Sequence, residues 1–210
     1  LEGDTLVVEG KYALYTLDVS EPFSPDVVAE LGFESMVVGL TEVSNGLIVA
    51  ATELGISVVD VSDPSEPVLV SGLLLSREDG WVAELDEGQG GDDWGADEKV
   101  RLASNGSALA MYVDGEILFF RVSAAESPEL LSVLDTGEPC ESLRFLGGLL
   151  YTSVEKQSPF GWVIDATNPL SPELIGEHLV GDWASGVAYG DGWSYRIMDQ
   201  ELWVALVEDL

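Results

Sequence analysis

One stretch of the sequence decides the fold: Ile56-Ser57-Val58-Val59-Asp60-Val61-Ser62-Asp63-Pro64-Ser65-Glu66-Pro67. It begins as a short apolar run, which is typical of a buried strand, and it ends in an aspartate followed by two prolines. Proline fixes its own φ, lacks an amide donor and disfavours helix in the residue before it, so the second half must be a turn. The stretch therefore predicts a strand, a proline turn and a further strand at residues 68–73.

The same unit occurs three more times. In every copy a proline lies seven residues after a marker position, and the markers are Asp18, Asp60, Arg121 and Asp165. The distance is 42 residues from 18 to 60, 61 from 60 to 121, and 44 from 121 to 165, and a degenerate fifth copy has Leu206 at the marker. A period of about 42 residues with strand-like content is typical of a β-propeller blade.

Each repeat predicts four strands. In the second repeat we expect them at 36–43, 47–51, 56–61 and 68–73, and Asn45-Gly46 supplies the tight turn between the first two. The first copy begins in its second strand and the last copy stops after its third. No stretch has a 3.6-residue apolar period, so we expect almost no helix.

We therefore predict an all-β chain that forms a single β-propeller domain over residues 1–210, with about five four-stranded blades of which the terminal ones are incomplete. The repeats cover 1–35, 36–76, 100–139, 140–181 and 182–210, and an acidic insertion covers 77–99. The blades either close into a ring or form part of a larger propeller. A closed five-bladed ring is expected, because an open one exposes sheet faces and strand edges.

The charge balance excludes some partners. The chain has 39 acidic and 8 basic residues, a net charge of −31. Such a surface repels phosphate backbones and anionic membranes, so we expect no nucleic-acid partner. No apolar run is long enough to predict a transmembrane segment, and no signal peptide is visible, although residue 1 is Leu, which indicates a processed or excised chain. Basic partners, divalent cations or high salt suit the surface, and acids that only maintain solubility are the other interpretation.

The repeats resemble those of the LVIVD-repeat β-propeller family. The resemblance rests on residues 56–70 and on the upstream residues 43–50, and only the second repeat matches closely. The third departs at Arg121 and Ala125, and the fifth lacks the marker acid and the prolines. The resemblance implies a propeller, usually in exported or cell-surface proteins of bacteria and archaea, and so an extracellular or cell-surface location. It implies no single activity, so no catalytic residue is carried over.

The candidate binding residues lie in loops. Trp81 and Trp94 of the insertion, and Trp183 in an inter-blade connection, are candidates for contact with a partner, because long loops on a rigid scaffold often carry function. The insertion also contains a candidate calcium site, since hard cations prefer clustered carboxylate oxygens; its ligands would be Asp92, Asp93, Asp97 and Glu98. The spacing matches no common calcium loop, and a solvated loop without a ligand is the other interpretation.

Other chemistry has weaker support. Cys140 is the only cysteine and His178 the only histidine, so an internal disulfide and a His/Cys metal site within one chain are excluded. We expect Cys140 to be a buried apolar residue. Asp18, Asp60 and Asp165 recur once per blade beside a turn, and we interpret them as acceptors for turn amides rather than as catalytic acids.

The sequence therefore favours a non-catalytic binding or scaffolding module that presents loops to a protein or glycan partner. One alternative is a hydrolase or lyase that uses carboxylates at the propeller channel. Another is a structural subunit that joins a larger assembly by strand exchange between incomplete blades.

Overall fold

The structure is a computed structural model, and it describes residues 4–44, 46–75, 100–113, 115–137, 140–154, 160–179, 184–190, 193–198 and 201–206. These ranges contain strands and turns, and no helix long and apolar enough to cross a membrane. The strands are β1 (Thr5–Glu9), β2 (Ala13–Asp18), β3 (Asp26–Gly32), β4 (Val37–Ser44), β5 (Leu47–Thr52), β6 (Gly55–Asp60), β7 (Val68–Leu74), β8 (Arg101–Ser104), β9 (Leu109–Val113), β10 (Glu116–Arg121), β11 (Glu129–Asp135), β12 (Cys140–Leu146), β13 (Leu149–Val154), β14 (Phe160–Asp165), β15 (Glu173–Leu179), β16 (Ala184–Gly190), β17 (Trp193–Met198) and β18 (Glu201–Leu206).

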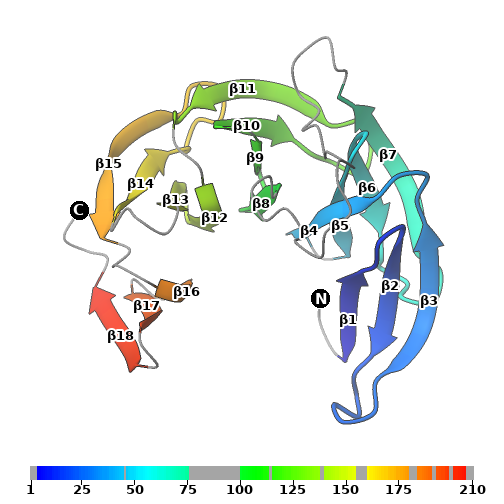
Figure 1. Ribbon diagram of the computed structural model, residues 1–210. Coiled ribbons are helices and arrows are strands. Elements are labelled where there is room, and N and C mark those ends of the chain that lie inside the picture. The colour runs from blue at the N-terminus through cyan, green and yellow to red at the C-terminus, as the bar shows by residue number, and fades with distance from the viewer. Residues whose placement is uncertain are drawn as a thin grey trace, which may run out of the picture.

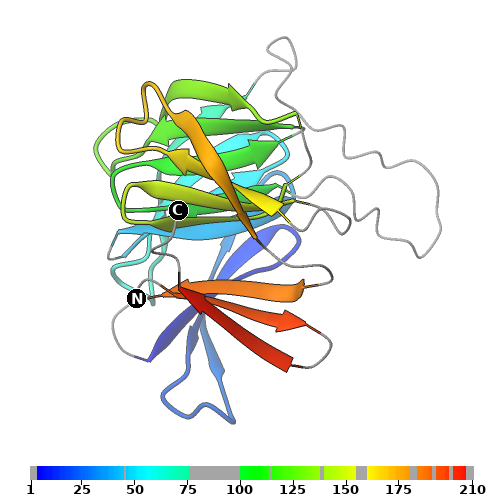
Figure 2. The same cartoon turned by 90° about the vertical axis from the view of Figure 1, so that its left-hand side faces the viewer.

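The strands form five antiparallel sheets in chain order. The first sheet is β1-β2-β3, the second β4-β5-β6-β7, the third β8-β9-β10-β11, the fourth β12-β13-β14-β15 and the last β16-β17-β18. The sheets lie side by side around an arc, and β4, β8 and β12 contact one another in succession along its inside (Figure 1). Viewed from the side, successive sheets lie face to face (Figure 2). This arrangement confirms the predicted propeller with incomplete terminal blades.

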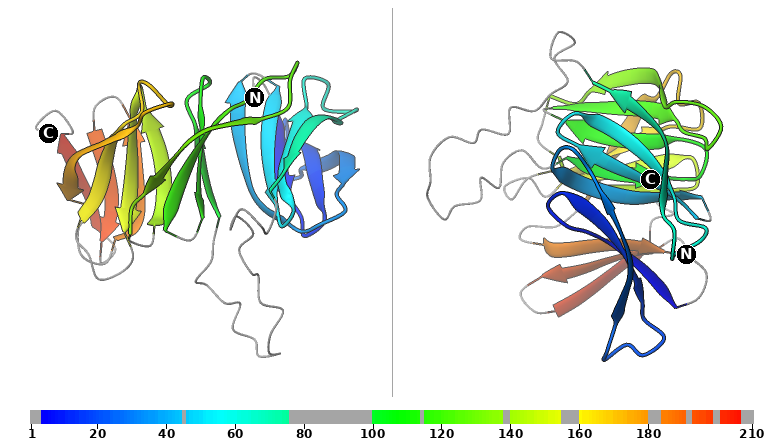
Figure 3. Two further views of the ribbon diagram at one scale, coloured as in Figure 1. Left: turned by 90° about the horizontal axis from the view of Figure 1, so that it is seen from above. Right: turned by 90° about the vertical axis from the view of Figure 1, so that its right-hand side faces the viewer.

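The arc is open, which corrects the expectation of a closed five-bladed ring. The first and last sheets lie at opposite ends of the arc, as seen in the view along its axis (Figure 1) and in the view from above (Figure 3). The angle between neighbouring blades is set by the side chains packed between them, and at that angle five sheets do not complete a turn. The first sheet has no counterpart of β4 and the last has none of β7 within the described residues.

Apolar side chains fill the space between the sheets. We call the face of each sheet that is turned toward the preceding sheet its rear face, and the opposite one its forward face. Leu109 and Phe120 on the rear face of the third sheet pack against Val49, Ile56 and Val58 on the forward face of the second, and all five are buried. Because strand residues alternate between faces, an alternating pattern of buried positions supplies both sides of each interface.

The predicted turns occupy the predicted places. Gly46, Gly106 and Gly147 have φ of +75°, +84° and +61°, a region that favours glycine. Pro25, Pro67, Pro128 and Pro172 each directly precede the outermost strand of their sheet, namely β3, β7, β11 and β15. The four prolines therefore mark equivalent turns, as the repeat predicted.

Each outermost strand also has a bulge at the same place, which the sequence analysis missed. The register of β7 on β6 shifts between Val58 and Val59, so that Val70 has no opposite partner. The corresponding extra residues in the other sheets are Val28, Leu131 and Ile175. Two consecutive apolar residues after each proline turn, where strict alternation would allow one, are the signal in the sequence.

Candidate functional site

The antiparallel strand order separates the connections of the propeller into two faces. One, which we call the connection face, holds the turns between the second and third strand of each blade and the links from an outermost strand to the next blade. The other, the turn face, holds the Asn-Gly and Gly-Gly turns and the proline turns. A link between blades is the natural place for an inserted loop, because it crosses the surface without interrupting a sheet.

A repeated backbone hydrogen bond holds the connection face together. The residue after each outermost strand donates its amide to the turn between the second and third strands of the same blade. Phe33 N donates to Tyr12 O at 2.8 Å, and Leu75 N donates to Leu54 O at 3.0 Å. In the third blade Thr136 N donates to the carbonyl of Gly115 at 2.9 Å. We call this first residue after the outermost strand the root of the link, and in three blades the same hydrogen bond fixes it.

A backbone hydrogen bond also joins the first two sheets on this face. Val37 N donates to Lys11 O at 3.0 Å, which connects the start of the second sheet to the turn of the first. Within the second blade, Glu53 N donates to Met36 O at 3.1 Å and Met36 N donates to the Glu53 carboxylate at 3.3 Å. The loops on this face therefore start from a rigid platform.

The platform exposes apolar and aromatic side chains beside charges. Tyr12 and Leu54 occupy equivalent turns and are each about half exposed, at 51% and 49%. The ammonium of Lys11 lies 5.4 Å from the centroid of the Tyr12 ring, a cation–π distance. The connection face therefore carries an exposed aromatic ring, an exposed aliphatic side chain and a cation beside the ring.

The structure fixes the ends of the predicted binding loops but not the predicted residues. Trp81 and Trp94, and the candidate calcium ligands Asp92, Asp93, Asp97 and Glu98, lie outside the described residues, as does Trp183. Trp81, Trp94 and the four candidate calcium ligands belong to the segment that connects β7 to β8 and follows the anchored Leu75. Trp183 belongs to the segment between β15 and β16. The described ends of both links, residues 75 and 100 for the first and 179 and 184 for the second, belong to the connection face by topology.

A metal site is not apparent elsewhere. In the part of the chain that the structure describes, no group of three or more His, Cys, Asp or Glu side chains is placed to hold an ion. The calcium assignment stays a prediction.

The repeated aspartates cap turns on the turn face. Ser20 N donates to Asp18 Oδ1 at 2.8 Å, Ser62 N to Asp60 Oδ1 at 2.9 Å, and Thr167 N to Asp165 Oδ1 at 3.0 Å. This confirms the interpretation made from the sequence.

These hydrogen bonds favour the ionised carboxylate. The pKa of Asp60 is lowered by hydrogen bonds from the hydroxyl and the amide of Ser62, and that of Asp165 by the same two groups of Thr167. The pKa of Asp18 is lowered by the amide of Ser20 and then by its hydroxyl. A carboxylate with a lowered pKa is a poor general acid near neutrality, so these residues belong to the blade structure.

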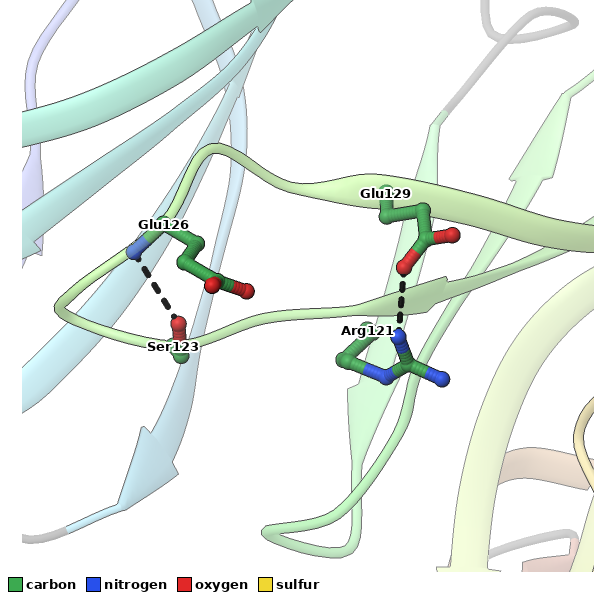
Figure 4. A network of polar contacts seen from close by, with 4 residues as sticks. All are labelled: Arg121, Ser123, Glu126 and Glu129. Carbon is green, nitrogen blue, oxygen red and sulfur yellow. Dashed lines mark hydrogen bonds and ion pairs between the residues drawn. The ribbon is translucent and has the colours of Figure 1, made fainter.

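The third repeat replaces the cap by an ion pair. Arg121 stands at the marker position, and its Nη1 lies 2.5 Å from the Glu129 carboxylate across the turn (Figure 4). Ser123 Oγ accepts the amide of Glu126 at 3.2 Å within the same turn. Different chemistry therefore closes the same loop, which explains how this repeat departs from the pattern without losing the turn.

Hydroxyls join some blades through the proline turns. Thr16 Oγ1 donates to Pro64 O of the next blade at 2.5 Å, and Ser132 Oγ donates to Pro169 O of the next blade at 2.6 Å. Ser71 stands at the position of Ser132, but its hydroxyl is buried without a hydrogen-bond partner. By its place in the repeat, Ser71 faces the proline turn of the third blade. In that turn Ala125 stands where the second and fourth blades have Pro64 and Pro169.

Cys140 is buried and its thiol contacts Ser142 O at 3.0 Å. Its burial within a hydrophobic cluster confirms the prediction of a buried cysteine.

Comparison with known protein families finds one match. The sequence profile of the LVIVD repeat matches residues 45–73, which span β5, β6, the proline turn and most of β7. The chain carries an LVIVD repeat. The match falls on the second repeat, whose residues first suggested the resemblance. No curated protein matches the chain.

Solved structures with the same architecture are larger than this LVIVD-repeat chain. Hsv2p of Kluyveromyces lactis is 13% identical with a TM-score of 0.62, and the match covers 99% of this chain and 60% of that one. A protein from Lactobacillus plantarum is 13% identical with a TM-score of 0.66, and the match covers 93% of this chain and 61% of that one. At this identity the likeness shows the fold alone. The chain spans about 60% of the length of these structures.

Sequence reasoning missed the exposed turn residues of the connection face. Tyr12, Leu54 and Gly115 lie 42 and 61 residues apart, the same spacings as the marker positions. An alignment of the repeats would have placed all three in one structural role, although nothing in their residue types links them.

Proposed function

We propose that this LVIVD-repeat propeller is a non-catalytic binding or scaffolding module that presents its connection face to a protein partner outside the cell or at the cell surface. The observation that supports the proposal most directly is the repeated hydrogen bond that anchors the root of each described blade link in the first three blades. Rigid roots are what a binding loop needs if its contacts are to be made without a large loss of entropy.

The position of the insertion supports the same surface. Residues 77–99 stand in the link whose root is Leu75, and they contain Trp81 and Trp94. Tryptophan is among the residues most enriched at the energetic centre of protein interfaces. Tyr12 and Leu54 add exposed apolar area on the same face.

Charge determines the kind of partner proposed. With 39 acidic and 8 basic residues, the chain attracts proteins with basic surfaces through long-range forces. Acidic side chains would speed association and make it sensitive to salt, while the aromatic residues would provide contact area. The extracellular or cell-surface location rests on the family resemblance and is part of the proposal.

The proposal can be tested with a displayed library of random peptides selected on the immobilised full chain. We expect enriched peptides that combine Lys or Arg with aromatic residues, and affinities that fall as salt is raised. The double variant Trp81→Ala with Trp94→Ala should weaken the selected peptides at least tenfold. A matched control is Val82→Ala with Leu85→Ala, which truncates apolar residues of the same insertion and should have little effect.

The function would be wrong if selection enriched no peptide, or if the selected peptides bound equally well after residues 77–99 were replaced by a Gly-Ser linker. A parallel glycan array separates the two partner classes. Binding to glycans, lost in the tryptophan variant, would replace the protein partner by a sugar.

A further inference from the structure

The outermost strands of the first four sheets, β3, β7, β11 and β15, share one pattern of exposure but differ in charge. In each of β3, β11 and β15 two acidic residues stand at exposed positions; these are Asp26 and Glu30, Glu129 and Asp135, and Glu173 and Glu177. The strand β7, Val68–Leu74, contains no charged residue. Charged side chains on an edge strand discourage pairing with another chain. Among these four strands, β7 is therefore the one without this protection.

Apolar side chains on β7 are exposed without any charge between them. Leu74 is 79% exposed and Val70 is 38% exposed, and Val68 and Leu69 are about half exposed. The other outermost strands also expose apolar residues, for example Val28 at 42%, but there an acid stands two residues away on either side. An exposed apolar edge strand is a template for pairing with a further strand.

The backbone of β7 is also oriented for pairing. The second sheet has the order β4-β5-β6-β7, so β7 is its edge strand. Leu75 N, just beyond the strand, donates to Leu54 O of the same blade, which turns this amide inward. Alternate residues of an antiparallel ladder turn their N–H and C=O groups to opposite sides, so Leu74 and Gly72 turn theirs outward. Gly72 is exposed and has no side chain to obstruct a second strand.

The position of β7 leaves room for a second strand. It lies on the outside of the arc, on the edge of its sheet that is farthest from the inner strand β4 (Figure 1). A strand that pairs with β7 antiparallel about a two-fold axis at Gly72 extends the second sheet outward. A second copy that supplies this strand lies beyond the rim of the arc and not over the other sheets. In this register Leu74 stands opposite Val70 of the second copy, and both residues are exposed.

Charge indicates that a second copy of this chain is the occupant. Each copy has a net charge of −31, so two copies repel each other wherever acids face acids. Antiparallel pairing of two β11 strands would bring Glu129 of one copy beside Asp135 of the other. Two β7 strands meet with no charge on either side. A basic partner would be attracted to the acidic strands instead, so the uncharged strand fits another uncharged strand best.

We propose that two copies of this chain form a dimer in which their β7 strands pair antiparallel and join two four-stranded sheets into one of eight strands. Both copies use the same surface, so the interface is isologous and the association stops at two. The contact uses the rim of the arc, so it is separate from the partner binding proposed for the connection face. A single pair of strands buries a small area, so the dimer is weak.

Salt gives the dimer a signature. The two copies repel each other at long range, while the residues in contact are uncharged. Salt screens the repulsion, with a Debye length of about 10 Å at 0.1 M and about 3 Å at 1 M. The dimer should therefore strengthen as salt is raised, the opposite of the behaviour expected for a basic protein partner.

Sedimentation velocity of the full chain over a range of concentrations and salt tests the proposal. We expect the mean sedimentation coefficient to rise with concentration, to level off at the value of a dimer, and to do so at lower concentration in higher salt. Val70→Glu should weaken the dimer at least tenfold. The matched control is Val28→Glu, because Val28 holds the same bulge position on β3 and is 42% exposed, and this variant should associate like the wild type. Circular dichroism shows whether each variant is folded.

Mixing two variants tests the register. Leu74→Lys and Val70→Glu chains should each dimerise weakly alone, whereas their mixture should form a heterodimer, because the two new charges are opposite and face each other. A chain that stays monomeric at every concentration and salt would overturn the proposal, and so would Val70→Glu chains that associate like the Val28→Glu control. A mixture that stays monomeric would exclude the antiparallel register at Gly72, and with it the proposed dimer. Peptides selected on the connection face should bind Val70→Glu like the wild type, so a failure of the dimer is distinguishable from a failure of the proposed function.

Discussion

Truncation of the same residue type at the same blade position should have very different costs in different blades. Leu109→Ala removes three carbon groups from a site that is 0% exposed, and Leu6→Ala removes them from a site that is 48% exposed. At about 0.8 kcal/mol for each buried group, full burial gives about 2.4 kcal/mol, and a residual cavity raises the usual range to about 2.7–5 kcal/mol. For Leu6 about half of the transfer energy applies and no closed cavity forms, so the cost is about 1 kcal/mol.

Urea denaturation at low protein concentration, followed by circular dichroism, measures both costs. Leu150→Ala is the internal replicate, because Leu150 is 0% exposed in the fourth sheet and should match Leu109→Ala. Equal losses of stability for Leu6→Ala and Leu109→Ala in dilute solution would refute the difference between the covered and the uncovered rear faces.

Three further predictions concern the polar residues. Ser132→Ala should destabilise by about 1 kcal/mol because it leaves the Pro169 carbonyl without its hydroxyl donor, whereas Ser71→Ala should be neutral or stabilising because it removes a buried unpaired hydroxyl; thermal melts of both variants are the check. Because the pKa of Asp60 is lowered from 3.8 in the folded chain, its carboxylate stabilises the fold above that pH and the effect is lost as the pH falls through the folded pKa. The stability difference between wild type and Asp60→Asn should therefore shrink in acid, and a difference that is constant with pH would contradict the cap. Arg121→Ala should change stability by less than about 1 kcal/mol, measured in urea, because both partners of its ion pair are exposed.

The local features of this fold could be predicted from the sequence because their causes are local. Proline at position 67 restricts its own backbone and that of its neighbour, glycine at 46 permits a positive φ, and Asp60 accepts the amide two residues ahead. Each of these constraints acts within a few residues. The turns, the strand order within a blade and the structural role of the repeated aspartates therefore followed from the residues alone.

Features that depend on neighbouring blades could not be predicted in the same way. The sequence of Leu6 and Leu17 resembles that of Ile48 and Val59, yet only the latter pair is covered. Whether a ring closes depends on the angle between blades, which is set by many contacts and has no single residue as its signal. The bulge at Val70 had a signal, the two consecutive apolar residues, but it conflicts with simple alternation and was overlooked.

These observations describe a fold whose interactions run mainly between nearest neighbours. The second, third and fourth sheets each cover their rear face with the sheet before them, and the hydroxyls of Thr16 and Ser132 each reach only the next blade. In such an arrangement the free energy of unfolding is approximately the sum of a contribution from each blade and a contribution from each interface between neighbouring blades. Among the residues whose burial the structure describes, the rear face of the first sheet at Leu6 is therefore a surface on which a further sheet would bury apolar area.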